Sequence, residues 1–196
     1  MTIKKLTLMA ILTALALIIF IVEAQIPMPV PVPGVKLGLA NAVTLFALFY
    51  GSQRKKKQNL SDHLPNTREP SPCVKAQPPS PCFTAFNVFT ILLCRIILGA
   101  VFTGRPIVFV YSFVGGVLGF AAQVIMKRFV TNKQIWVCGA VGAVFHNVGQ
   151  ILAAILITGT PAIATYLPVL IIAGVITGVL TGLIAQLTLE RLRGRF

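Results

Sequence analysis

Six long apolar stretches dominate this 196-residue sequence and constrain its fold more than any other feature. A helix that crosses a bilayer needs about 20 mostly apolar residues, because each of its backbone polar groups must be paired within the helix. We place six such spans at residues 6–26, 37–51, 85–104, 107–126, 135–157 and 167–189. Hydrophobic residues make up 56% of the chain, which exceeds what one soluble core would carry. The sequence predicts an all-α membrane protein, a single domain of six transmembrane helices.

The first stretch follows Lys4 and Lys5, and a secretory signal peptide also has basic residues before its apolar part. Its apolar part is longer than the about 7–15 residues usual in a signal peptide. Proline and methionine follow it at Pro27 and Met28, where a cleavage site would have small residues. We expect a retained helix.

Lysine and arginine are distributed unevenly between the two sides of this arrangement. Of the 17 basic residues, 14 lie before the first span, in the second and fourth connections, or after the last span. The opposite connections hold Lys36 and Arg105. Cytoplasmic loops of membrane proteins carry such an excess, so both termini are predicted to be cytoplasmic. We expect the membrane to be a bacterial plasma membrane. The net charge of +13 then reflects topology and gives no reason to expect nucleic acid.

Two connecting segments differ from the rest. Residues 52–83 begin with a basic run and continue rich in proline, serine and asparagine, so we expect a polar, disordered cytoplasmic loop. Residues 27–33 have proline at alternate positions, which fixes an extended path. This second segment is either a stiff connector or a semi-rigid lid over an outward-facing pocket.

Several chemistries are excluded by what the sequence lacks. It has four acidic residues, no phosphate-binding glycine loop with lysine, and no paired carboxylates for magnesium diphosphate. Its four cysteines form no CxxC pair. We therefore expect no enzyme activity, no metal and no cofactor.

Polar residues inside the apolar spans are the best candidates for a functional site, because burying them in a membrane is costly. The candidate substrate-binding residues are Asn41, Arg95, His146, Asn147 and Gln150. His146 and Gln150 are four residues apart and share one helical face. Arg95 requires backbone carbonyls, Glu23 across the bundle, or an anionic ligand as its partner. Structural pairing and ligand binding both remain open for it.

Small residues recur every four positions in three spans, and such stripes let helices approach closely. The glycine stripes, at Gly115 and Gly119 and at Gly174, Gly178 and Gly182, predict packing within the bundle. Ala10 and Ala14 form a shorter stripe in the first span. It could face either the bundle or a partner protein.

Four segments carry a resemblance to a known family: KLGLAN at 36–41 with VTL at 43–45, RIILG at 95–99, the glycine pair at 115–116, and GAVFHNVGQ at 142–150. They resemble the Gx transporter family, also labelled heptaprenyl diphosphate synthase component I. That family is similar to the S components of energy-coupling factor (ECF) transporters. The resemblance implies six helices with both ends inside, a pocket near the outer face, and a contact for a T component at Ala10 and Ala14. A T component and ATPase subunits would then be partners.

Three functions follow from these observations. The first is a membrane subunit that captures a small anionic or amphipathic substrate from outside for an ECF-type transporter. The second is a membrane accessory to heptaprenyl diphosphate synthesis, as the other family label implies. The third is a scaffold or membrane enzyme of another kind.

Overall fold

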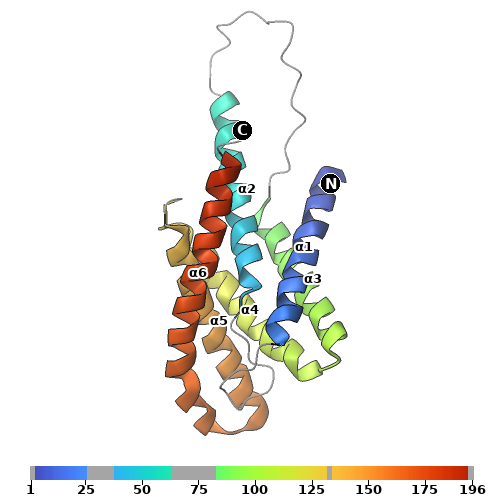
Figure 1. The fold of residues 1–196 in the computed structure, drawn as a ribbon, viewed down its shortest axis with the longest axis vertical. Helices are drawn as coiled ribbons and strands as arrows, with labels where there is room; N and C mark the ends of the chain where they lie inside the picture. The colour runs from blue at the N-terminus through green and yellow to red at the C-terminus, as the bar shows by residue number, and fades with distance from the viewer. Residues whose placement is uncertain (1–2, 26–37, 63–82, 132–133, 194–196) are drawn as a thin grey trace, which may run out of the picture.

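The computed structural model describes residues 3–25, 38–62, 83–131 and 134–193, and these are almost entirely helical, without a strand among them. In chain order the helices are α1 (Ile3–Ala24), α2 (Asn41–Asp62), α3 (Ala85–Thr103), α4 (Pro106–Met126), α5 (Ile135–Thr158) and α6 (Leu167–Arg193), with a short 3-10 helix η1 (Pro161–Tyr166) before α6 (Figure 1). The predicted all-α class is confirmed.

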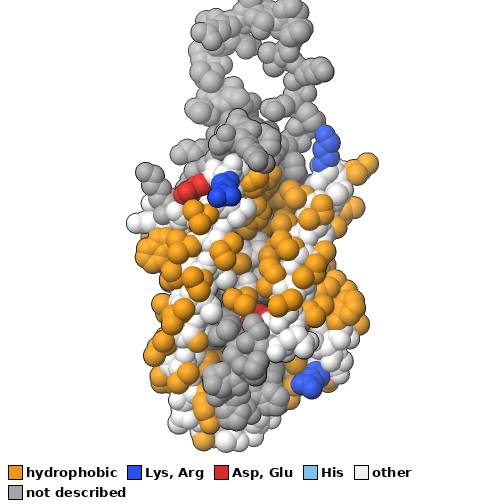
Figure 2. All heavy atoms as spheres, in the orientation of Figure 1, with side chains coloured by type: hydrophobic (Ala, Val, Ile, Leu, Met, Phe, Trp, Pro, Cys, Tyr) orange, Lys and Arg blue, Asp and Glu red, His pale blue; other side chains and the backbone are white. Residues whose placement is uncertain are grey.

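Within the described residues, five helices are long and apolar enough to cross a membrane: α1, α3, α4, α5, and η1 with α6. Their outward faces carry large apolar side chains, such as Val101 and Leu156, which suit lipid contact (Figure 2). These features indicate a membrane protein. The apolar part of α2, Asn41–Gly51, is shorter than the others, and six crossings remain a prediction.

Helix α2 differs from the sequence expectation. We expected the polar segment to begin at residue 52, but the helix continues to Asp62. Residues 52–62 contain no proline or glycine and are rich in lysine, arginine and glutamine, which are good helix formers. Residues 63–82, the rest of that segment except Phe83, lie outside the described residues. Phe83 is buried against α1 and α2.

Helices α4, α5 and α6 pack closely because glycines line both seams between them. A Cβ atom built on Gly119 of α4 would lie 2.8 Å from the carbonyl oxygen of Gly142 on α5. One built on Gly178 of α6 would lie 2.6 Å from Cα of Ala140 on α5. Only glycine allows this approach of the backbones, and the predicted role of the glycine stripes within the bundle is confirmed.

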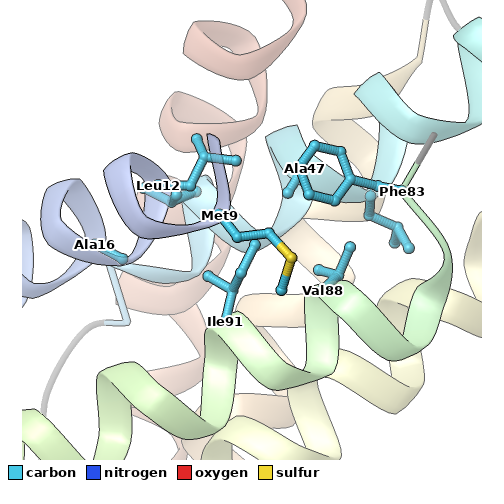
Figure 3. Close-up of a cluster of buried hydrophobic side chains, with 9 residues drawn as sticks. Met9, Leu12, Ala16, Ala47, Phe83, Val88 and Ile91 are labelled. Atoms are coloured by element: carbon cyan, nitrogen blue, oxygen red, sulfur yellow. The ribbon is translucent and has the colours of Figure 1, made fainter. Parts of the chain in front are cut away.

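Helix α1 packs against α3 and α2 through ordinary apolar side chains. Met9, Leu12 and Ala16 of α1 meet Ala47 of α2 and Ile91 of α3 in one buried cluster (Figure 3). The same cluster contains Val43, Leu48, Phe83 and Val88. The bundle thus has one side, α4–α6, that packs through glycines, and another side, α1–α3, that packs through larger apolar side chains.

Both ends of the chain lie at one end of the bundle, as Figure 1 shows. The turn between α3 and α4 lies at the other end, where Gly104 adopts the left-handed conformation with φ of 62°. Because α1 starts at the end with the termini, its last turn, with Glu23, lies toward the opposite end.

Candidate ligand-binding site

The interior of the bundle contains an unusual number of buried polar side chains. They include Glu23, Asn41, Arg95, Ser112, Gln123, His146, Asn147 and Gln150, all less than 9% exposed. Burying a polar group is unfavourable unless it is hydrogen-bonded, so each of these side chains needs a partner or a ligand.

Four helices surround a small cavity among these residues. It is lined by Phe20 and Glu23 of α1, Gly38 and Ala40 before α2, Arg95 of α3, Ser112 of α4, and His146 and Gln150 of α5. Its volume is about 10 Å³, close to the minimum that one water molecule needs. Pockets for drug-sized ligands are much larger, about 300–1,000 Å³. In this conformation the cavity has room for a water-sized group.

Arg95 is the central charged residue of the cavity. It is 2% exposed, and its Nη2 donates a hydrogen bond to Oδ1 of Asn41 over 3.1 Å. Glu23 is near enough to attract the guanidinium electrostatically. Nε of Arg95 and Nδ2 of Asn41 have no hydrogen-bond partner among the described residues. The pair therefore holds donors that a ligand could satisfy.

Gly38 closes one corner of the cavity. Its backbone N–H donates to Oε1 of Glu23, which connects the start of α2 to the last turn of α1. A Cβ atom built on Gly38 would lie 2.9 Å from Cδ2 of His146 and 3.0 Å from Nδ2 of Asn41. Gly38 also has a φ of 80°, a conformation that side chains rarely adopt. Glycine is thus needed here for both space and backbone geometry.

The opposite wall is formed where α4 and α5 meet. Gly115 of α4 lies directly against His146 and Gln150. A Cβ atom built on Gly115 would be only 2.8 Å from the carbonyl oxygen of His146, so a larger residue would not fit. The close approach of the two helices brings Ser112 of α4 to the same cavity as His146 and Gln150. The predicted common face of these two α5 residues is present in the structure.

The structure places the predicted site residues in different surroundings. Arg95, His146 and Gln150 line the cavity, and Asn41 is bonded to Arg95 beside it. Asn147 instead donates through Nδ2 to the carbonyl oxygen of Leu170 on α6, over 2.7 Å. The proline-rich segment 27–33 lies outside the described residues, so its expected role as a connector or lid stays a prediction.

Sequence reasoning left several cavity residues out of the site. Glu23 was considered only as a partner for Arg95, although a single acid in an apolar span was a usable signal. Ser112 and Phe20 gave no such signal, since serine and phenylalanine are common in membrane helices. Gly38 lies in the KLGLAN segment of the family resemblance but was not proposed as a site residue.

The predicted partner-contact residues lie on the outside of α1. Ala10 and Ala14 are exposed, whereas Met9, Leu12 and Ala16 form the buried face of that helix. Among the described residues, no group of three or more histidine, cysteine or acidic side chains could hold a metal ion.

Comparison with known protein families gives a match that covers most of this chain. A family model described as heptaprenyl diphosphate synthase component I matches residues 12–57 and 82–188. The chain belongs to this family. All eight residues that line the cavity fall within the matched ranges of the component I family. The unmatched residues 58–81 lie within the polar segment that the sequence sets apart.

Membership of the component I family confirms the family resemblance seen in the sequence. No curated protein and no solved structure matches the chain. The similarity to ECF S components therefore stays a prediction.

Proposed function

We propose that this component I family member is the substrate-binding membrane subunit of an ECF-type uptake transporter. The observation that supports the proposal is the cavity at Arg95, in which a buried guanidinium and the amide of Asn41 present donors without a protein partner in the described chain. Such donors favour a ligand that carries oxygen acceptors. We propose Arg95, Asn41, His146 and Gln150 as substrate-binding residues. Asn147 would connect α5 to α6 through its hydrogen bond to Leu170.

The distribution of charge supports an outward-facing cavity. Lys4 and Lys5 precede the core of α1, Lys127 and Arg128 follow α4, and the opposite turn between α3 and α4 holds Arg105. The positive-inside rule places the basic end, with both termini, in the cytoplasm. The cavity, near the last turn of α1, would then lie in the half of the membrane that faces outward in a bacterial cell.

Transport by this subunit would depend on partners. The sequence holds no phosphate-binding loop, so an integral T component and ATPases would supply the energy. The exposed stripe of Ala10 and Ala14 is the surface we propose for the T component, because small side chains permit close helix contact in lipid.

The family description favours a second candidate function. As a heptaprenyl diphosphate synthase component I, the chain would be a membrane accessory to polyprenyl diphosphate synthesis, acting with another subunit. Prenyl transfer uses carboxylates to hold magnesium diphosphate, and the sequence has four acidic residues without a paired motif. The chain would serve this role without being the catalytic subunit.

Native mass spectrometry of the purified chain tests the leading proposal. We expect a small molecule that co-purifies with the wild-type protein and is lost in Arg95→Met, while the exposed-site control Arg105→Met retains it. A ligand bound equally by both variants would overturn the assignment of the cavity. A soluble prenyl synthase that co-purifies and becomes more active with this chain would favour the second function.

A further inference from the structure

We infer that the last two turns of α1 are a movable wall of the cavity, kept closed by Phe20 and Glu23. The inference rests on the proposed binding function. In the present conformation the cavity has room for a water-sized group. A binding subunit with this cavity therefore needs a second, more open conformation, and the contacts around the cavity indicate which wall moves.

The wall formed by α4 and α5 is not suited to movement. A Cβ atom built on Gly149 of α5 would lie 2.9 Å from Cα of Gly115 on α4, so the two backbones are in direct contact. No side chain stands between them that could rotate to make room. The seam between α5 and α6 is also lined with glycines. Packed interiors of this kind resist deformation, so this wall stays in place.

Helix α1 has fewer neighbours than the other side of the cavity. Its backbone comes close to α2 and α3 and to no other described helix. Ile18 and Val22, in its last two turns, are 59% and 58% exposed. No described helix covers this side, so the end of α1 can move outward without displacing another helix. Met9, Leu12 and Ala16 hold the earlier part of α1 in a buried cluster.

Phe20 and Glu23 connect the end of α1 to the cavity, which both line. Phe20 lies against α3, because a Cβ atom built on Gly99 would be 2.5 Å from its Cε1. Glu23 accepts a hydrogen bond from the backbone N–H of Gly38 and lies near the guanidinium of Arg95. A buried carboxylate is favourable only while it is paired. Glu23 therefore stabilises the closed position of α1.

A thiol inside the cavity would report its opening. Ser112 lines the cavity and is 3% exposed, and cysteine has nearly the same size as serine. The full chain, with its four native cysteines replaced by alanine, carries Ser112→Cys and is treated with N-ethylmaleimide in detergent. This reagent is larger than a water molecule and does not fit the closed cavity. We expect slow modification of Ser112→Cys and fast modification of Arg105→Cys at an exposed position.

Three substitutions release the wall to different extents. Glu23→Ala removes the charge and the acceptor for Gly38, and should raise the rate of modification of Ser112→Cys about tenfold. Glu23→Gln keeps an acceptor and should raise the rate less. Gly99→Ala displaces the ring of Phe20 and should also raise the rate. This last substitution changes no charge near the thiol, so altered thiol reactivity would not explain its effect.

Leu12→Ala is the control on the same helix. It loosens the buried cluster between α1, α2 and α3 without touching Phe20 or Glu23. It should lower the melting temperature and leave the rate of modification unchanged. The inference would be overturned if Glu23→Ala and Gly99→Ala both left the rate unchanged, or if Leu12→Ala raised it equally.

Native mass spectrometry separates the movable wall from the binding function. If neither Glu23→Ala nor Gly99→Ala changes the rate, while a co-purified ligand is still lost in Arg95→Met, the binding function stands and the movable wall fails. If both substitutions open the cavity but no ligand co-purifies with the wild-type chain, the movable wall stands and the binding function fails.

Discussion

Arg95 of α3 and Asn41 of α2 form a buried hydrogen bond between residues 54 positions apart in the chain, with 3.1 Å between Nη2 and Oδ1. This bond joins two helices next to the cavity and orients both side chains. It is therefore a structural link as well as a part of the proposed site.

A double-mutant cycle measures this link. Asn41→Ala and Arg95→Met should each lower the free energy of unfolding, and the double variant should lose less than the sum, because the two side chains share one interaction. We expect a coupling of about 1–2 kcal/mol, at the upper end for hydrogen bonds between membrane helices. Reversible unfolding in mixed micelles gives the four values. Additive losses would show that the bond contributes nothing to stability.

The sequence predicted the helices well because hydropathy reports lipid contact directly. The predicted boundaries of α3, α4 and α5 lie within one residue of the observed ones. The predicted end of α2, at residue 51, was wrong because the basic run at residues 54–57 resembles a solvated loop in composition. Those residues are nevertheless good helix formers, and a helix can continue beyond the apolar region.

The site was predictable only where one helix decides the geometry. His146 and Gln150 were grouped correctly, since residues four apart share a face. Asn147 follows His146 by one residue and is therefore rotated by about 100° around the helix axis, which directs it toward α6 instead of the cavity. Whether Glu23 and Ser112 reach the same cavity depends on how the helices pack, and no local pattern reports that.

Asn147 and Gln150 should therefore have separable roles. Asn147→Ala removes the bond to Leu170 and should lower stability by about 0.6 kcal/mol, the average for such bonds, without changing ligand binding. Gln150→Ala should lose the co-purified ligand in native mass spectrometry. Thermal unfolding gives the stability of both variants. Loss of the ligand in Asn147→Ala alone would place Asn147, and not Gln150, in the site.

Gly178→Ala should destabilise the seam between α5 and α6. The added methyl group would meet the Ala140 backbone at 2.6 Å and the Gly139 carbonyl oxygen at 2.7 Å, so the helices must separate. We expect a loss of about 1–3 kcal/mol, as for overpacked cores. Val175→Ile, which adds a methyl group on the exposed face of the same helix, is the control. Equal stability of the two variants would contradict the close packing of α5 and α6.

Cysteine labelling tests the proposed orientation. In intact cells, a membrane-impermeant maleimide should not modify Cys73, which lies outside the described residues in the predicted cytoplasmic loop. It should modify a cysteine introduced at the exposed Arg105, between α3 and α4. Inverted vesicles should give the reverse pattern. Labelling of Cys73 from outside would reverse the orientation and place the cavity in the cytoplasmic half.

Ala14→Leu tests whether the outer face of α1 is a partner contact. Ala14 and Ala10 are exposed, so a larger side chain meets no described part of the chain. The isolated variant should therefore fold and bind ligand like the wild type. In cells it should lose transport and co-purification with a T component, because leucine would prevent the close helix contact that small residues permit.

Ala16→Leu is the matched control on the same helix. Ala16 is 0% exposed within the cluster between α1, α2 and α3, so the same substitution there should destabilise the isolated chain. The contrast separates a partner surface from an internal seam, since both variants add the same side chain two residues apart. If Ala14→Leu leaves transport and partner binding intact, the T component does not dock on this stripe. The proposal of an ECF-type partner would then lose its residue-level support.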